Sequence, residues 1–255
     1  MSIHLEDVFY SIGDVQILNG VSIEIIEGEF LTVLGPNGSG KSSLMKVLAG
    51  DITPQKGKVI FDGIELKKIN ISKRAQVRSV MSQSQQIIYD YSVRDIVEMG
   101  WISSLNDAYE KDFYIALEEI SKKCEIKDIL NRRFNSLSGG EQRKVHFART
   151  LIQLNNINQK NKYMFFDEPT ANLDISHELN FMNILREKAN EGFGIFLILH
   201  DLELAYNFSD KIAFMKEGKI MYHGEPNSIY ENDILTQIYD VPIYFNKVEN
   251  KLKYY

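Results

Sequence analysis

Short apolar runs separated by polar turns make up most of this sequence. Residues 3–9 and 21–26 alternate partly between apolar and polar positions and indicate strands, while Glu29–Leu34 has the short, β-branched character of a buried parallel strand. Asp62-Gly63 and Glu217-Gly218 indicate turns between paired strands. The same pattern predicts further strands at 58–61, 65–66, 77–81, 163–166, 195–199, 212–215 and 219–222.

Helical spacing alternates with these strands. Leu44–Ala49 is expected to form a helix that ends at Gly50, and another helix is predicted from about Ser176 to Asn190. From 92 to 137 the pattern is helical, and it begins at Ser92-Val-Arg-Asp95, which resembles a capping box. Strands that alternate with helices predict an α/β fold with a mostly parallel sheet.

The composition is that of an ordinary globular protein. Of the 255 residues, 44% are apolar and 25% are charged, and the formal net charge is -6. A mildly acidic chain is a poor candidate for neutralising phosphates, so no nucleic-acid partner is expected. The single cysteine, Cys124, excludes a disulfide framework and favours an intracellular setting with a structural thiol. The sequence shows no signal-peptide pattern and no apolar run of about 20 residues, so another chain would have to supply any membrane span.

The most specific local motif is Gly35-x-x-x-x-Gly40-Lys41-Ser42, between a predicted strand and a predicted helix. Its glycines let backbone N–H groups close around phosphate oxygens, and the helix N-terminus adds positive potential. The Lys41 ammonium suits the β- and γ-phosphates of a nucleotide, and the Ser42 hydroxyl suits Mg²⁺. The predicted nucleotide ligands are Gly35, Pro36, Asn37, Gly38, Ser39, Gly40, Lys41, Ser42 and Ser43.

Two acidic residues follow the apolar run Tyr163–Phe166. Asp167 and Glu168 would then lie at the carboxyl edge of the sheet, where open α/β sheets bind their ligands. At that edge Asp167 is placed to hold Mg²⁺, and Glu168 is placed to act as general base toward the attacking water. The phosphate loop and this acidic pair together predict a P-loop NTPase.

The segment Leu137-Ser138-Gly139-Gly140-Glu141-Gln142 indicates which branch of the P-loop NTPases this is. Two glycines before a helix expose N–H groups, and Ser138 adds a hydroxyl, a combination that suits a γ-phosphate. The string resembles the signature motif of the ATP-binding-cassette family, and it lies between the two nucleotide motifs as that family requires. The resemblance implies that ATP is contacted by Ser138, Gly139, Gly140 and Glu141.

Four more positions match family elements one by one. Tyr10 looks like the aromatic residue that stacks on adenine, and Gln83 is similar to the Q-loop glutamine that contacts Mg²⁺ and water. Asp174 ends Ala171-Asn172-Leu173-Asp174, which resembles the D-loop that touches the opposite subunit, and His200 looks like the switch histidine at the γ-phosphate. The implied catalytic residues are Glu168, His200, Gln83 and Lys41, and the implied Mg²⁺ ligands are Ser42, Gln83 and Asp167. The other histidines are interpreted as structural or solvated: His4, His146, His177 and His223.

The resemblance runs from about Ile3 to Val241 and implies a whole architecture. That architecture is a P-loop NTPase (RecA-like) core with a mostly parallel sheet, an N-terminal antiparallel β subdomain and an inserted α-helical subdomain. The single cassette would span 1–255, with its ATP-binding core at 1–86 and 146–245 and its helical subdomain at 87–145. Family cassettes face each other head to tail around ATP, so one cassette per chain implies a homodimer or a pair with a homologue.

Within the family, the chain resembles ATPase subunits of importers for metal chelates. Ser92–Gly100 is similar to the segment after their Q-loop, Leu199–Ala205 is similar to their switch region, and haem importers often carry polar residues where Gln153–Lys162 lies. Three departures leave the substrate open: Glu203 replaces the usual Asn, Trp101 replaces a frequent Arg, and Arg143-Lys144 replaces the Gln-Arg of many relatives.

The resemblance implies uptake of haem through transmembrane permease subunits, with a substrate-binding protein acting indirectly. The cassette would sit peripherally on the cytoplasmic face of the inner membrane. The alternatives are a ferric-siderophore or cobalamin importer, an exporter, and a non-transport cassette ATPase. Repair ATPases of this family carry long coiled-coil insertions, and no sustained heptads appear here. A small-molecule P-loop kinase would lack the string at 137–142.

Overall fold

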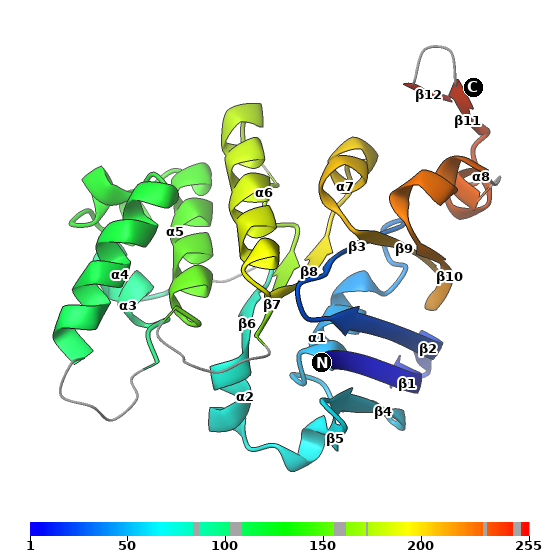
Figure 1. Ribbon diagram of the computed structural model, residues 1–255, viewed down its shortest axis with the longest axis horizontal. Helices are drawn as coiled ribbons and strands as arrows, with labels where there is room; N and C mark the ends of the chain where they lie inside the picture. Colours follow the sequence, from blue (N-terminus) through cyan, green and yellow to red (C-terminus); the bar gives the residue numbers. More distant parts are fainter. Residues whose placement is uncertain are drawn as a thin grey trace. The chain divides into compact units, whose positions relative to one another are not determined.

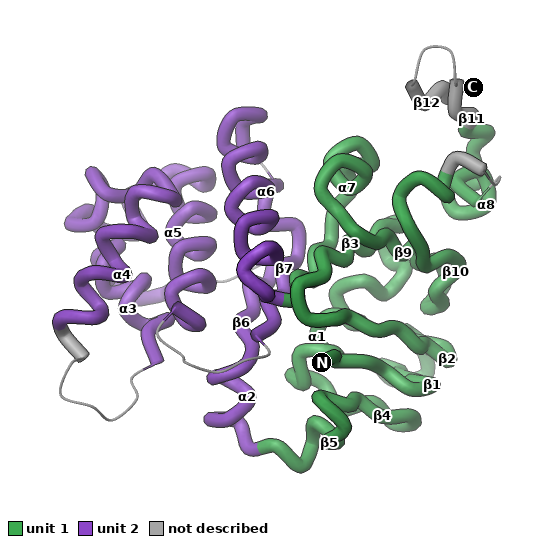
Figure 2. Tube along the Cα trace, in the orientation of Figure 1, with its two compact units in different colours: residues 1–69, 194–255 green, residues 70–193 purple. Residues whose placement is uncertain are grey.

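The computed structural model describes residues 1–83, 87–102, 109–155, 162–171, 173–231, 234–246 and 251–254. The chain divides into two compact units (Figure 2). Unit 1 combines 1–69 with 194–255, and unit 2 is the continuous segment 70–193. The helical subdomain expected at 87–145 falls inside unit 2, and its exact division from an ATP-binding core stays a prediction.

Unit 1 begins with an antiparallel sheet, in the strand order β2-β1-β4-β5 (Figure 1). Its strands are β1 (Ser2–Ile12), β2 (Val15–Ile26), β4 (Lys56–Phe61) and β5 (Ile64–Glu65). Ile3, Leu5 and Val8 of β1 are buried. The N-terminal antiparallel part of the prediction is confirmed. The predicted start of β2 at residue 21 was wrong, because Gln16 and Gly20 interrupt the apolar alternation of a strand that begins earlier.

The second set of strands in unit 1 follows the order β10-β9-β3-β8. These strands are β3 (Phe30–Leu34), β8 (Gly194–Ile198), β9 (Lys211–Lys216) and β10 (Lys219–Gly224). β3 pairs in parallel with β8 and β9, and every residue of β3 and β8 is buried. The remaining elements are α1 (Lys41–Leu48), α7 (Leu202–Phe208), α8 (Ile234–Tyr239), β11 (Ile243–Asn246), β12 (Lys251–Tyr254) and the 3₁₀ turns Leu66–Lys68 and Pro226–Glu231.

Unit 2 holds a parallel strand pair and most of the helices (Figure 1). The strands are β6 (Arg78–Met81) and β7 (Tyr163–Asp167). The helices are α2 (Ile71–Val77), α3 (Val93–Glu98), α4 (Tyr109–Lys123), α5 (Gly139–Ile152) and α6 (Ile175–Asn190), with 3₁₀ turns at Lys127–Ile129 and Phe134–Ser136. The prediction of a strand from Val77 was wrong by one residue, because Val77 ends α2. The helical stretch expected from 92 to 137 is broken into α3, α4 and these two short turns.

Caps and aromatic packing fix the helices of unit 2. Ser92 forms the predicted capping box of α3, because its hydroxyl accepts from Asp95 N and the Asp95 carboxylate accepts from Ser92 N. Phe147 of α5 stacks on Phe181 of α6 with ring centroids 3.9 Å apart. Cys124 is buried, and burial raises the pKa of its thiol, which agrees with a structural cysteine. Among the described residues, no helix has the length and apolar character needed to cross a bilayer.

Candidate nucleotide-binding site

The phosphate loop has the predicted context in unit 1, since β3 leads into it and α1 leaves it. Gly35 has φ 144 and Gly40 has φ 103, a region that favours glycine. A Cβ on Gly35 would lie 2.0 Å from Met215 O, and one on Gly40 would lie 2.8 Å from Ile17 O. Both positions therefore exclude any side chain, because backbone carbonyls of β9 and β2 occupy the space that it would need.

The loop residues differ in their exposure to solvent. Asn37 and Gly38 are exposed at its tip, where a Cβ on Gly38 would meet nothing within 4 Å. Ser39 is buried, and its backbone N–H donates to Pro36 O at 3.2 Å while its carbonyl accepts from Gly218 N at 3.0 Å. The loop is thus held in shape by its own chain while its tip stays open. Ser42 and Ser43 follow in the first turn of α1.

Lys41 is buried at the first position of α1. Its ammonium donates to Gly35 O at 2.8 Å and to Pro36 O at 2.9 Å. These two carbonyls compensate the cost of burying the charge. An ammonium held over the loop by carbonyl oxygens can exchange them for phosphate oxygens, which are stronger acceptors.

The other two predicted ligands of unit 1 lie on β1 and at the end of β8. Tyr10 is half-buried on β1, opposite Leu18 of β2. His200 is exposed and follows Leu199, whose N–H donates to Val33 O at 3.3 Å. Since β3 and β8 are parallel neighbours, His200 and the phosphate loop leave the same edge of the sheet. The structure therefore brings these two predicted elements to one edge.

Unit 2 carries the acidic pair. Asp167 is the last residue of β7 and is 2% exposed, while Glu168 takes a left-handed conformation with φ 50. Gln83 follows the neighbouring strand β6, and its side-chain amide donates to Glu168 Oε2 at 2.8 Å. A left-handed glutamate is strained, and such strain concentrates at functional sites. The predicted base and the predicted Q-loop glutamine are therefore direct partners.

Arg143 of α5 joins this group, and the sequence marked it only as a departure from relatives. Its Nε donates to Ala171 O and its Nη1 donates to Gln83 O, both at 3.3 Å. Burial lowers the pKa of the guanidinium, while the negative charges of Glu168 and Asp167 act in the opposite direction. Arg143 places a positive charge near the acidic pair, and no sequence signal predicts its contacts with the two loop carbonyls.

Ser138 is the N-cap of α5 and forms a capping box with Glu141. Its Oγ accepts from Glu141 N at 3.3 Å, so the hydroxyl proton stays available for donation. The carboxylate of Glu141 accepts from Ser138 N at 2.8 Å and from Arg132 Nη1 at 2.9 Å. The hydrogen bonds with Ser138, and then Arg132, lower the pKa of Glu141. Glu141 Oε2 thus serves this cap and Oε1 pairs with Arg132, and the predicted contact of Glu141 with nucleotide stays a prediction.

The two glycines after Ser138 are open on the side where a side chain would project. A Cβ on Gly139 would meet nothing within 4 Å, and one on Gly140 would meet only Leu173 Cδ2, at 3.6 Å. Neither has a positive φ among the described residues, so the backbone does not require glycine there. The first turn of α5 therefore has open space beside its two glycines, and the N–H groups at a helix N-terminus suit an anion.

The predicted D-loop ends at Asp174, the N-cap of α6; its Asn172 lies outside the described residues. Asp174 Oδ1 accepts from His177 N at 2.9 Å, from Ser176 Oγ at 2.9 Å and from His177 Nδ1 at 2.6 Å. The backbone bond from His177, then the Ser176 and His177 side chains, lower the pKa of Asp174 to about 2. Asp174 is therefore ionised at neutral pH.

The predicted Mg²⁺ ligands have the donor chemistry that this ion needs. Mg²⁺ binds through oxygen, usually through one or two carboxylates together with substrate phosphates and water. Asp167 supplies a buried carboxylate, Gln83 a side-chain amide and Ser42 a hydroxyl. The described residues contain no cluster of three or more His, Cys, Asp or Glu side chains that could hold a metal alone. The set therefore fits an ion that is carried in part by nucleotide phosphates.

Comparison with known proteins gives consistent matches. The model of the ABC transporter family matches residues 18–171. The Hemin import ATP-binding protein HmuV of Escherichia coli O157:H7 is 32% identical over 242 residues, which are 94% of this chain and 93% of that protein. HmuV of Bartonella henselae is 35% identical over 235 residues, covering 91% of this chain and 88% of that protein. A solved dimeric structure of a bacterial ABC transporter cassette matches with a TM-score of 0.75 at 24% identity, over 88% of this chain and 98% of that chain.

Proposed function

The chain belongs to the ABC transporter family, and we propose that it is the ATPase subunit that powers haem uptake by an importer. Like its family, it binds and hydrolyses ATP. One observation carries the haem assignment: proteins named for hemin import are 32% and 35% identical to it over more than nine-tenths of its length. The substrate assignment rests on those relatives, whereas the site described above concerns ATP alone.

We infer the following roles for the site residues. The Lys41 ammonium leaves the carbonyls of Gly35 and Pro36 for the β- and γ-phosphates of ATP, and the loop N–H groups close on the same oxygens. Tyr10 stacks on adenine. His200, at the edge where the loop begins, contacts the γ-phosphate. These groups bind and orient ATP, and the loop needs little rearrangement because its own chain already holds it.

The chemical step falls to the acidic pair of unit 2. Glu168 accepts the proton of the attacking water, and Gln83 holds that carboxylate through Oε2 until the nucleotide arrives. Mg²⁺, with Ser42, Gln83 and Asp167 as its proposed protein ligands, would neutralise charge on the phosphates. Arg143 keeps the Q-loop and the D-loop in place through their carbonyls.

A second copy of the chain completes each site in this proposal. Ser138 and the N–H groups of Gly139 and Gly140 would reach the γ-phosphate of the opposite subunit, since they lie open at the start of α5. The dimeric cassette among the solved structures supports this arrangement. Membrane permease subunits would bind the cassette pair at the cytoplasmic face of the inner membrane, and a substrate-binding protein would deliver haem to the permease.

Deleting the gene in its host tests the substrate directly. The deletion strain should fail to grow with haem as sole iron source, and the wild-type gene should restore growth. A Glu168→Gln copy is the matched control, because it should be folded and inactive. Suppose instead that the deletion strain grows normally with haem but fails with a ferric siderophore as iron source, or fails in a medium where growth requires added cobalamin. That compound would then replace haem as the substrate, and the ATPase assignment would be unchanged. Normal growth of the deletion strain under all three conditions would contradict the importer proposal.

A further inference from the structure

The C-terminus of helix α4 has a backbone conformation in which glycine is the usual residue. The N–H of Ile126 donates to Ser121 O at 2.9 Å, and the N–H of Glu125 donates to Lys122 O at 3.1 Å, which is the pattern of a Schellman motif. Glu125 occupies the left-handed position of that motif, with φ 56. Glycine is the usual residue there because a side chain strains the left-handed backbone. The contacts of the glutamate side chain must therefore offset this strain.

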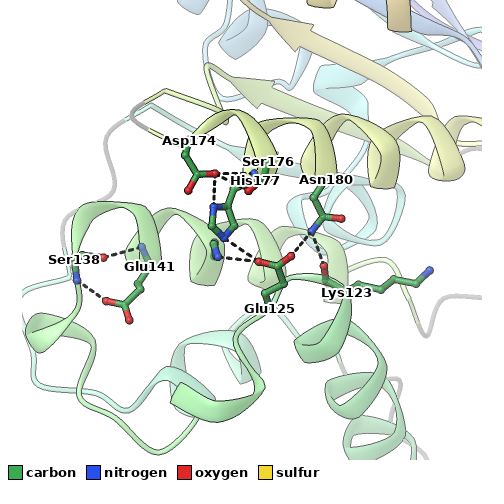
Figure 3. Close-up of polar contacts among 9 residues, drawn as sticks. Lys123, Glu125, Ser138, Glu141, Asp174, Ser176, His177 and Asn180 are labelled. Atoms are coloured by element: carbon green, nitrogen blue, oxygen red, sulfur yellow. Dashed lines mark hydrogen bonds and ion pairs between the residues drawn. The ribbon is translucent and has the colours of Figure 1, made fainter.

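The carboxylate of Glu125 connects two helices of unit 2 (Figure 3). From α5, Lys144 Nζ approaches Glu125 Oε2 at 3.0 Å. From α6, His177 Nε2 lies 2.9 Å from the same oxygen, and Asn180 Nδ2 donates to Oε1 at 3.4 Å. Glu125 thus joins the helix that begins at the signature motif to the helix that begins at the D-loop.

The imidazole of His177 lies between two carboxylates. Its Nδ1 is 2.6 Å from Asp174 Oδ1, and its Nε2 is 2.9 Å from Glu125 Oε2. A carboxylate accepts hydrogen bonds and does not donate them, so both contacts are hydrogen bonds only when both ring nitrogens carry a proton. The imidazolium form therefore closes the chain from Asp174 to Glu125. The neutral ring keeps one of the two bonds and turns a lone pair toward the other carboxylate.

We propose that Glu125 and His177 are positioning residues for ATP hydrolysis, which hold the D-loop aspartate Asp174 in register with the signature helix α5. The proposal rests on the function proposed above, because the D-loop and the signature motif act together only in a dimer of cassettes. A movement of the D-loop then moves the signature motif, and a movement of the signature motif moves the D-loop. The link runs from Asp174 through the His177 ring and the Glu125 carboxylate to Lys144 of α5.

Three charged groups surround the imidazole ring. They are Asp174 at the N-cap of α6, Glu125 after α4, and Lys144 of α5, which pairs with the same Glu125 oxygen. Loss of either His177 or Glu125 breaks the chain of contacts between Asp174 and α5, so either loss should loosen the link.

Two variants of the full-length protein separate positioning from folding. His177→Gln replaces the two ring nitrogens, which contact different carboxylates, by one amide nitrogen that cannot reach both. Glu125→Gly removes the carboxylate and also relieves the left-handed strain, so its thermal midpoint should equal or exceed that of wild type. Both should lower kcat for ATP about two- to fivefold, the size expected for a partly exposed ionic network. The KM for ATP should not change, because neither residue belongs to the phosphate loop.

The matched control is Glu118→Gln, which removes a carboxylate that pairs with Lys122 and Lys127 at 2.9 Å and 2.6 Å. Its kcat should equal that of wild type. An unchanged kcat in both variants, or a Glu125→Gly protein whose kcat falls only with its thermal midpoint, would overturn the proposal. A wild-type protein without ATPase activity would instead overturn the proposed function.

Discussion

The phosphate loop and the signature motif are both glycine-rich segments before a helix, yet the space around their glycines differs. A Cβ on Gly35 would lie 2.0 Å from a backbone carbonyl of the same chain, whereas a Cβ on Gly139 would meet nothing within 4 Å. Lys41 is buried over its own loop, while Ser138 is exposed. The first glycine is required by the fold of the chain itself. Beside the second, the described residues leave open the space that a Cβ would take.

This difference is the one expected if the two segments belong to different halves of the proposed site. The phosphate loop has its shape before nucleotide binds, because the backbone of β2 and β9 packs against Gly40 and Gly35. The signature motif has its cap satisfied by Ser138 and Glu141, and its first turn is open. A surface of this kind suits a ligand brought by another molecule, which agrees with a γ-phosphate on the opposite subunit.

The largest effect is expected from Glu168→Gln, which should separate binding from chemistry. The amide keeps the shape and cannot accept the proton, so kcat should fall on the order of 10²–10⁴-fold. ATP binding should remain, since both glycine-rich helix starts are intact. Size-exclusion chromatography with and without ATP should then show an ATP-dependent dimer. A variant that stays monomeric with ATP and keeps normal turnover would contradict the assignment of the base.

Lys41→Ala tests the half of the site that is complete in one chain. A charged hydrogen bond is worth about 1.5–3 kcal/mol, so ATP affinity should fall roughly 10- to 150-fold. Lys58→Ala, which removes an exposed lysine from β4, should bind ATP like wild type. Titration with a fluorescent ATP analogue would measure both. Equal affinity for the Lys41 variant and the wild type would exclude Lys41 as a phosphate ligand.

Alanine at Gly35 and at Gly139 sharpens the contrast directly. Gly35→Ala should lower the free energy of unfolding by about 1–3 kcal/mol, because its methyl collides with Met215 O. Gly139→Ala should leave stability equal or slightly higher, since Ala is the better helix former by about 1 kcal/mol. Its kcat should nevertheless fall, to about one-tenth, if a phosphate must approach that turn. Urea denaturation and ATPase assays would distinguish the two, and a fully active Gly139→Ala protein would refute a close phosphate.

The smallest effect is expected from Arg143→Gln. Glutamine is too short to reach both Ala171 O and Gln83 O, so the Q-loop and D-loop carbonyls lose one shared donor. We expect kcat to fall about threefold, with KM for ATP unchanged. An Arg143→Lys protein should behave like Arg143→Gln, because lysine lacks the fork that reaches two carbonyls. Full activity of both proteins would show that Arg143 does not support the two loops.

Much of the fold and the motifs followed from local sequence. The strand predicted at Glu29–Leu34 is β3, and Asp167 does end a buried strand. The helix predicted at Leu44–Ala49 is α1, which begins earlier, at Lys41, because the polar residues Lys41, Ser42 and Ser43 in its first turn hide the helical pattern. Helix α2 was missed because seven mostly polar residues show no helical period; Asn70, which caps it, was the available signal. Of the polar insertion expected at Gln153–Lys162, residues 156–161 lie outside the described residues.

The contacts of Glu125, Arg143 and His177 could not be predicted, because each joins segments far apart in the sequence. His177 was interpreted as structural or solvated, and the structure makes it a partner of Glu125, which lies in a different segment of the sequence. Glu125 sits where a glycine would be ordinary, and only φ reveals the anomaly. Local patterns carry the motifs that bind ATP, whereas the links between those motifs depend on tertiary packing.

The most direct test of the shared site mixes two inactive proteins. Lys41→Ala lacks a working phosphate loop, and Ser138→Asp keeps a good N-cap while it places a carboxylate at the γ-phosphate. Each alone should have little ATPase activity. A mixed dimer holds one intact site, formed by the loop of one chain and the signature motif of the other, so an equal mixture should recover about a quarter of wild-type activity if one site turns over alone. No recovery in the mixture, with mixed dimers verified by differential tagging, would contradict the shared site.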